Sequence, residues 1–142
     1  MVRTKIVSVL LVALLGAVFI RLFLVEGFIV RGDSMAPNIL SGDYVFISKL
    51  AYLNKEPSHG DIIIASPRKS KIRIIKRVIG LPGEYVEINS KEFKLDPQEY
   101  FVVGDNKEAS IDSRDLGFID KWHIKGKAVS LFRIKSLKYI GL

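Results

Sequence analysis

Hydrophobic and polar positions divide this chain into two parts. Residues 6–20 carry no charge, and the apolar character resumes past Arg21 as far as Val25. This span of about 20 residues corresponds to roughly 30 Å of helix, which is long enough to cross a bilayer. Short β-favouring runs separated by turns follow it. The pattern predicts one N-terminal transmembrane helix followed by a mostly-β domain that begins near Gly27.

The apolar segment fits an uncleaved anchor better than a cleaved signal peptide or a buried core helix. No small-residue cleavage site follows it, and residues 6–20 show no polar stripe. Arg3, Lys5 and the terminal amine precede the span, whereas Arg21 and Arg31 lie on its far flank. The positive-inside bias therefore predicts a cytoplasmic N-terminus and anchor in residues 1–26, and an extracytoplasmic β-rich domain in residues 27–142.

The β domain is expected to contain seven strands. Turn signals such as Gly42-Asp43, Gly60-Asp61 and Pro82-Gly83 separate them at the spacing of a small sheet or barrel. No helical period of useful length appears outside the anchor, and no internal repeat is present. The expected strands are Phe28–Arg31, Asp43–Lys49, Asp61–Ser66, Lys71–Ile79, Glu84–Ile88, Tyr100–Val103 and Lys127–Ile134.

Composition limits what else the chain can hold. With 142 residues, 49% of them hydrophobic, it can form one compact core. The absence of cysteine excludes disulfides and thiolate metal sites. The formal charge is +7, and it is +5 without residues 1–26, which hold three basic residues and one acidic residue. A basic body beside a membrane favours anionic phospholipid, and no aromatic-interleaved basic motif indicates nucleic-acid binding.

Lys76 is the first candidate for chemistry. In the run from Ile72 to Val78, a two-residue strand period places Ile72, Ile74, Lys76 and Val78 on one face. Apolar surroundings disfavour the charged form of a lysine and lower its pKa. A neutral lysine can accept a proton, so Lys76 is a candidate general base, while Arg77 is expected to point the other way.

Ser34 is the matching candidate nucleophile. It lies in Gly32-Asp33-Ser34-Met35-Ala36-Pro37, a turn-prone sequence directly after an apolar segment. An alcohol becomes a useful nucleophile when a nearby base can take its proton. The residues alone therefore suggest a serine and lysine hydrolase.

Three separated segments resemble one known family. They are Ser34-Met35-Ala36-Pro37 with Gly42-Asp43, Lys76-Arg77-Val78-Ile79-Gly80-Leu81-Pro82-Gly83, and Gly104 to Arg114; Gly60 to Ile64 matches more loosely. In this order and behind an anchor, they closely resemble type I signal peptidases. The resemblance implies a signal-peptidase-like complex β fold. Only Glu84 to Tyr100 separates the second and third motif regions, so the large β insertion of bigger relatives is expected to be missing.

The resemblance also implies an activity and roles for individual residues. Signal-peptide-bearing preproteins would be cut after small, Ala-x-Ala-like residues at the outer face of the cytoplasmic membrane, without a cofactor or metal. Ser34 would be the nucleophile and Lys76 the general base. Ser110 matches a hydroxyl that orients the lysine, and Asp112 and Arg114 match a structural ion pair.

The oxyanion of the acyl-transfer intermediate requires hydrogen-bond donors, and the Ser34 backbone N–H is the first candidate. Some relatives place a serine hydroxyl two residues before the nucleophile, where this chain has Gly32. A main-chain group or water would then supply the second donor. Asn38 also departs from a threonine common in relatives, and a tuning effect is expected from it.

Substrate contacts are expected along two strand edges, Phe28–Arg31 and Lys71–Ile75, where an extended peptide could add as a further strand. The candidate pocket walls are Ile29, Val30, Ile74 and Ile75. Isoleucine and valine are more often plain core residues, so a core role competes with the pocket role for each of them. Phe28, Ile29 and Trp122 are candidates for contact with the membrane surface.

Several alternatives remain open from the sequence. His59 and His123 lie in no motif that would place them beside Ser34, and the acidic turn from Asp105 to Asp115 lacks the glycine and terminal glutamate of an EF-hand. A specialised relative with one dedicated secreted or pilin substrate, a self-cleaving repressor-like protein, and a non-catalytic membrane-tethered β module are the competing functions. The oligomeric state is not indicated.

Overall fold

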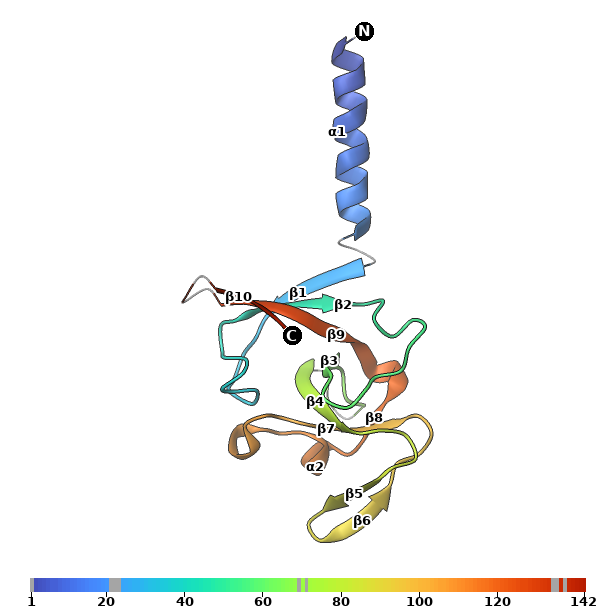
Figure 1. Cartoon of the computed structure of the whole chain (residues 1–142), viewed down its shortest axis with the longest axis vertical. Coiled ribbons are helices and arrows are strands. Elements are labelled where there is room, and N and C mark those ends of the chain that lie inside the picture. Colours follow the sequence, from blue (N-terminus) through green and yellow to red (C-terminus); the bar gives the residue numbers. More distant parts are fainter. Residues whose placement is uncertain (1, 21–23, 69, 71, 134–135, 137) are drawn as a thin grey trace.

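The computed structural model describes residues 2–20, 24–68, 70, 72–133, 136 and 138–142. One long helix stands on a β domain (Figure 1). The elements are α1 (Val2–Phe19), β1 (Val25–Ile29), β2 (Tyr44–Ser48), β3 (Ile62–Ala65), β4 (Ile74–Gly80), β5 (Tyr85–Ile88), β6 (Lys91–Lys94), β7 (Glu99–Val103), α2 (Ser113–Leu116), β8 (Ile119–Asp120), β9 (Ile124–Arg133) and β10 (Lys138–Gly141).

Helix α1 projects away from the β domain (Figure 1). Its apolar side chains are exposed, including Leu10 at 64% and Val12 at 69%. Among the residues that the structure describes, no helix has the length and apolar character needed to cross a membrane, so the expected anchor stays a prediction. Arg21, which the expected span includes, lies outside the described residues.

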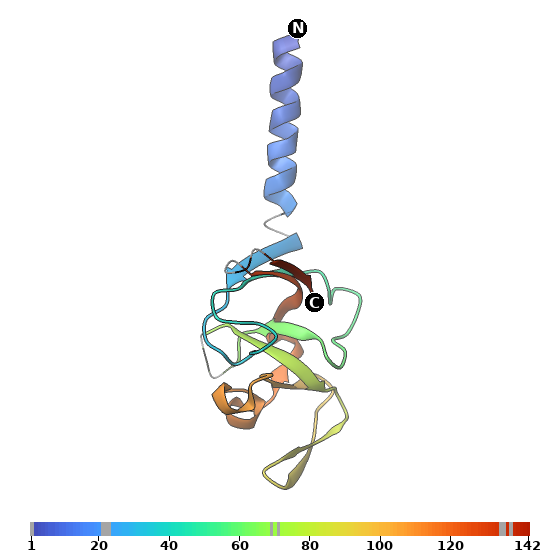
Figure 2. The same ribbon diagram turned by 60° about the vertical axis from the view of Figure 1, so that its left-hand side comes forward.

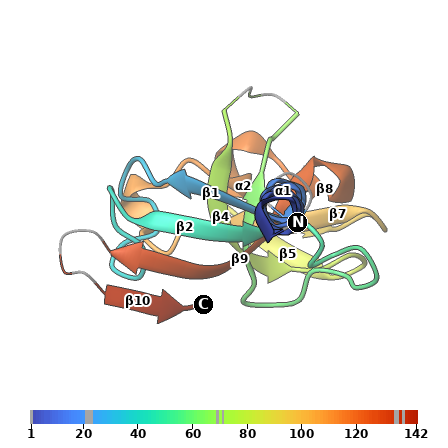
Figure 3. The same ribbon diagram turned by 90° about the horizontal axis from the view of Figure 1, so that it is seen from above.

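Eight of the described strands form one curved antiparallel sheet in the order β1-β2-β9-β3-β4-β7-β8, with β10 beside β9, and β5 and β6 form a separate hairpin. Strand β9 connects the two halves because one part pairs with β2 and another with β3. The register shifts between Phe46 and Ile47 and between Ile64 and Ala65, and such irregularities bend a sheet. Seen from above, β1, β2 and β9 lie beneath α1 (Figure 3).

Each expected strand overlaps an observed one, although the ends differ. The first strand begins at Val25, earlier than expected and before the proposed boundary at Gly27. Lys71 and Ile134, which were placed at strand ends, lie outside the described residues. Sequence analysis missed β6, β8, β10 and the one-turn helix α2.

The hairpin of β5 and β6 extends from the end of the domain opposite α1 (Figure 2). Its turn contains Asn89 and Ser90, both with positive φ, which is the conformation of tight hairpin turns. All four residues of β6 are exposed. This strand was missed because its sequence, Lys-Glu-Phe-Lys, has little of the apolar alternation that marks a half-buried strand.

Strand β4 places Lys76 inside the protein, with 4% of its surface exposed. The expectation that Ile72 shares its buried face was wrong, because Ile72 precedes the strand and is 72% exposed. Ile75, on the other face, is buried as well as Val78. The face of β4 that carries Lys76 and Val78 is therefore the buried one, whereas the opposite face is buried at Ile75 and exposed at Ile79.

Two clusters of buried apolar residues make up most of the core. The first includes Met35 and Ile39 from the segment after β1, packed against β2, β3 and β9. The second includes Ile63, Val78 and Tyr100 from β3, β4 and β7. The segment that carries Ser34 is therefore attached to the main core by two side chains with no exposed surface.

A buried ion pair attaches the same segment to β9. Asp43 is 3% exposed, and both of its oxygens accept hydrogen bonds from Arg133, with Nη2–Oδ2 at 2.8 Å. The Leu40 N–H also donates to Asp43, and Arg133 donates to the Asn38 carbonyl. This pair links the turn after Ser34 to β9.

Asp43→Ala removes the carboxylate that accepts hydrogen bonds from Arg133 and from the Leu40 N–H. We expect this change to lower the free energy of unfolding, because these hydrogen bonds are lost and the Leu40 N–H is left without its partner. Thermal unfolding of the full-length protein in detergent, followed by circular dichroism, measures this change. Glu92→Ala, at an exposed position in β6, is the matched control, and equal melting temperatures for the two variants would refute a structural role for the pair.

Candidate active site

Ser34 lies in the segment between β1 and β2 and is half-buried. Met35, the next residue, has no exposed surface, and its carbonyl accepts the Ile39 N–H at 2.9 Å. The Asn106 N–H donates to the Ser34 carbonyl at 3.0 Å. The core below and the loop after β7 thus hold the serine from two sides.

Lys76 reaches Ser34 from the middle of β4. Its Nζ lies 2.6 Å from Ser34 Oγ, within hydrogen-bond distance. Burial is the largest influence on the pKa of Lys76 and lowers it. The negative charges of Asp112 and Asp105 raise this pKa, whereas the positive charge of Arg114 lowers it further. Among the described residues, Lys76 forms no ion pair with a carboxylate. The arrangement therefore favours a neutral amine beside an alcohol.

Asp112 organises the loop behind the lysine. It has no exposed surface, and it accepts hydrogen bonds from Arg114 Nε and Nη2 at 2.8 Å, from Ser110 Oγ at 2.6 Å and from the Gly104 N–H at 3.0 Å. Burial by itself raises the pKa of Asp112, but hydrogen bonds from Arg114, Ser110 and the backbone outweigh it and hold the pKa at about 2. Asp112 is thus an anion at neutral pH.

Ser110 is hydrogen-bonded to Asp112 and lies close to the segment that carries Ser34. The resemblance assigned its hydroxyl to the lysine, but in the structure the hydroxyl donates to Asp112, and no hydrogen bond joins Ser110 to Lys76 in the described part of the chain. Gly104 packs against both Ser110 Oγ and the Ser34 carbonyl oxygen so closely that a Cβ atom would overlap them. The glycine allows the two serine-bearing segments to approach each other.

Arg77 points away from Lys76, as the strand alternation predicted. Its guanidinium donates to both oxygens of Asp105 at 2.7 Å and to the Gly60 carbonyl. The Asn38 side chain donates to the same carboxylate at 2.7 Å. Sequence analysis did not identify this link between the nucleophile segment and β4, because Asn38 and Asp105 are distant in the chain and share no motif.

One donor for an oxyanion is available beside Ser34. Within the described residues, the Ser34 N–H has no hydrogen-bond partner. Gly32 has φ of +90°, a conformation that disfavours a side chain, and its N–H donates to Ser41 Oγ at 3.3 Å. Ser41 thus brings a hydroxyl next to the position where some relatives have a serine, which sequence analysis had not identified.

Ser34 and Lys76 open onto a cavity of about 360 Å³ between β1 and the start of β4. Of the four expected wall residues, Ile29, Ile74 and Ile75 line it. Val30 does not; it is 2% exposed and packs in the core, because it points to the opposite side from Ile29. The other lining residues are Phe28, Arg31, Gly32, Ile72, Arg73 and Ile111.

Two strand edges border this cavity. Among the described residues, β1 pairs with β2 alone, so its other edge has no strand beside it. On β4, pairing with β7 begins at Arg77, which leaves residues 74–76 without a neighbour on that side. An extended peptide could hydrogen-bond to either edge with its backbone beside Ser34.

Neither histidine is paired with the serine. His59 Nε2 lies 2.9 Å from Glu84 Oε1, and His123 Nδ1 lies 3.2 Å from Asp120 Oδ2. In the part of the chain that the structure describes, no three His, Cys, Asp or Glu side chains form a group able to hold a metal ion. Lys76 is the base that the geometry offers.

Comparison with known proteins gives the chain a family. Residues 3–98 and 89–133 match the sequence model of the family described as signal peptidase, peptidase S26. Signal peptidase I T of Bacillus subtilis (strain 168) is 33% identical over 157 residues, covering 87% of this chain and 81% of the relative. A probable signal peptidase I-1 from Synechocystis is 32% identical, covering 89% and 80%.

Among solved structures, a signal peptidase I from Enterococcus faecalis V583 has a TM-score of 0.44 and 26% identity, covering 51% of this chain and 97% of that one. The family match spans most of the sequence, including the segments that carry Ser34, Lys76 and Asp112. The chain therefore belongs to the signal peptidase family, peptidase S26, and is a peptidase of the serine class.

Proposed function

We propose that this chain removes N-terminal signal peptides from exported preproteins, cutting after small residues of Ala-x-Ala-like sites. Ser34 is the nucleophile and Lys76 the general base. The observation that carries the proposal is the 2.6 Å contact between Ser34 Oγ and Lys76 Nζ inside a buried site. The signal peptidase I relatives, of which the alignments cover at least 80%, support the choice of substrate.

The proposed reaction needs one proton carrier. Neutral Lys76 accepts the Ser34 hydroxyl proton as Oγ attacks the scissile carbonyl carbon, and the Ser34 N–H donates to the developing oxyanion. The lysine then gives its proton to the leaving amine, and the C–N bond breaks to leave an ester on Ser34. In the second half, Lys76 takes a proton from water as the water oxygen attacks the ester carbonyl, and it returns that proton to Ser34 Oγ as the bond from Oγ to the acyl carbon breaks and the acid product leaves.

The proposed role of Ser110, Asp112 and Arg114 is to fix this carrier in place. Asp112 is anchored by Arg114 and the Gly104 N–H, and it accepts the Ser110 hydroxyl. Its negative charge lies near enough to oppose the fall in the pKa of Lys76. Because Arg114 balances that charge, the lysine is not drawn into an ion pair.

The proposed substrate lies as an added strand along β1 and β4. Ile29, Ile74 and Ile75 supply apolar walls for the cavity, which suits alanine-sized side chains. The peptide backbone would hydrogen-bond to the open edges and thereby bring its carbonyl to Ser34. Specificity then comes from the side chains that alternate into the cavity.

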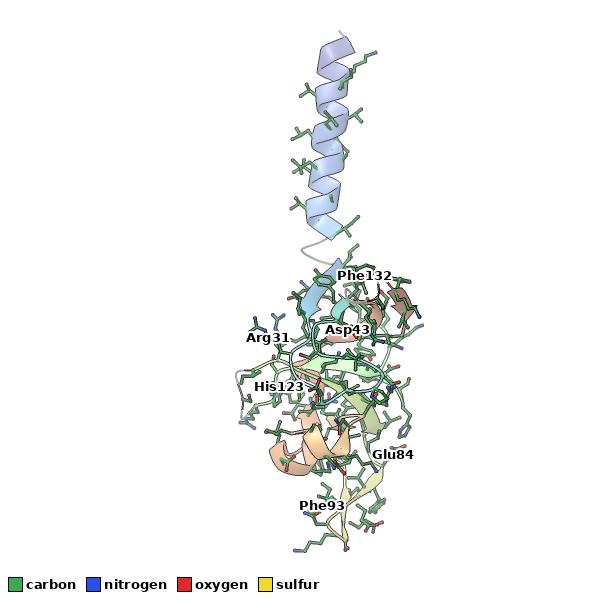
Figure 4. All side chains as sticks on the ribbon, turned by 90° about the vertical axis from the view of Figure 1, so that its left-hand side faces the viewer. Arg31, Asp43, Glu84, Phe93, His123 and Phe132 are labelled. Carbon is green, nitrogen blue, oxygen red and sulfur yellow. The ribbon has the colours of Figure 1, made fainter. Side chains whose placement is uncertain are left out.

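The proposed location is the cytoplasmic membrane. Residues 1–26 would form the cytoplasmic N-terminus and a single-pass anchor, and residues 27–142 the catalytic domain on the outer face. The exposed apolar side chains along α1 support this arrangement, because such a surface is favourable in lipid and unfavourable in water (Figure 4). Phe28, Ile29 and Trp122 remain candidates for contact with the lipid surface.

Substitution of either member of the dyad tests the reaction. We expect Ser34→Ala and Lys76→Met to lower kcat for preprotein cleavage in detergent by about 100-fold to 10,000-fold, because proton transfer or the acyl intermediate is lost. Lys91→Met, an exposed position in β6, should cleave like the wild type. Cleavage at the wild-type rate by both dyad variants would disprove the assignment.

The dependence of rate on pH tests the protonation state. Only neutral Lys76 can act as base, so kcat/KM should rise as pH increases through its pKa and then level off. Because burial lowers that pKa from the ordinary value of 10.5, the midpoint should lie below 10.5. Initial rates on a peptide without titrating groups measure it, and a flat profile would contradict lysine as the base.

Ser110→Ala tests positioning. Loss of the hydroxyl removes one hydrogen bond to Asp112 and loosens the wall behind Lys76, so we expect kcat to fall about 10-fold to 100-fold with little change in KM. Ser110→Thr keeps the hydroxyl and should restore most of the rate. Equal losses in both variants would indicate a packing effect and not the hydrogen bond.

A further inference from the structure

The catalytic cavity has an uneven charge. The charged side chains that line it are Arg31, Arg73 and Lys76, and no carboxylate does so among the described residues. The remaining lining is apolar apart from Gly32 and Ser34. A cavity whose charged groups share one sign attracts the opposite charge.

Arg31 is the cation available to a ligand. Arg73 is already paired with Glu26, Nη1 to Oε1 at 2.5 Å, and Lys76 is buried against Ser34. Arg31 is exposed and forms no ion pair in the part of the chain that is described. Figure 4 shows its side chain extending outward from the ribbon.

Nearby carboxylates do not cancel this charge within the cavity. Asp105 is paired with Arg77, and Asp112 is paired with Arg114. Asp33 is exposed and does not line the cavity. A carboxylate brought in by the substrate would therefore find an unpaired guanidinium, which binds carboxylates in a two-pronged geometry.

The distance along the chain limits where that carboxylate lies in the substrate. Arg31 precedes Ser34 by three residues, so the two Cα atoms are at most about 11 Å apart. An extended peptide covers this distance in about three residues. The acidic residue would thus be close to the bond that Ser34 attacks.

We propose that Arg31 is a specificity-determining residue that favours preproteins with an aspartate or glutamate within about three residues of the scissile bond. This inference rests on the proposed function and names a substrate class for the same site. An anionic lipid headgroup could also bind a guanidinium, but Arg31 shares its cavity with the nucleophile, where the peptide must lie.

The experiment compares peptides that differ in one charge. A signal-peptide substrate is prepared with Asp, Asn or Lys at each of the three positions on either side of the scissile bond. Cleavage by full-length enzyme in neutral detergent gives kcat/KM for the wild type, Arg31→Gln and Arg31→Glu. Lys91→Gln removes one charge from the exposed strand β6 and is the matched control.

For at least one position, the wild type and Lys91→Gln should cleave the Asp peptide about fivefold faster than the Asn peptide. The ratio should approach one in Arg31→Gln and should favour Lys over Asp in Arg31→Glu. It should also fall as salt is added, because exposed charges are screened. Absence of an Asp preference in the wild type, or its persistence in Arg31→Gln, would overturn the proposal.

Two further outcomes are distinct. If no Asn peptide is cleaved by the wild type, or if Ser34→Ala cleaves it equally well, the proposed function itself fails. The assay is repeated with phosphatidylglycerol added to the detergent. If Arg31→Gln lowers the rate only with this lipid and equally for all peptides, Arg31 binds lipid, and the specificity proposal is overturned.

Discussion

Lys76 is buried beside Ser34, and among the described residues it has no carboxylate partner. Burial of an unpaired ammonium is unfavourable, and it lowers the pKa of Lys76. Strand β4 supplies the burial, since its Lys76 face is turned inward and Lys76 is only 4% exposed. A partner carboxylate at contact distance would stabilise the ammonium and remove its capacity as a base. Asp112 and Asp105 lie near enough to affect the pKa of Lys76, but both are paired with arginines and not with the lysine.

Asp112 shows how this is achieved. Its carboxylate is fully buried, but its oxygens are occupied by Arg114, Ser110 and the Gly104 N–H. The pair of Asp112 and Arg114 carries little net charge. Asp112 raises the pKa of Lys76 and Arg114 lowers it, so the two effects oppose each other. A second pair, Asp105 with Arg77, repeats this arrangement on the other side of β4. Both carboxylates thus hold loops in place without forming an ion pair with Lys76.

Sequence analysis located seven of the ten described strands and the two residues, Ser34 and Lys76, that the structure brings together, because both leave local signals. Alternation in β4 separated Lys76 from Arg77, and the sequence around Ser34 indicated a turn after an apolar segment. It did not find β6, whose four residues are all exposed, and it placed Ile72 on the buried face although Ile72 precedes the strand and is exposed. Val30 was wrongly expected in the pocket wall, because the sequence does not show which side of the segment at the end of β1 faces the cavity. Contacts between distant segments, such as Asn38 with Asp105, have no local signature.

The order of the strands explains why so short a domain suffices for this site. Ser34 follows edge strand β1, Lys76 lies on β4, and Ser110 and Asp112 follow β7. Because β4 and β7 are neighbours, the lysine and the aspartate loop meet directly, and the curvature of the sheet brings the segment after β1 across to them. The β5–β6 hairpin connects β4 to β7 but contributes no residue to the cavity. Its length can therefore change without moving the dyad, whereas a shift of one residue in β4 would place Arg77 in the core and Lys76 in solvent.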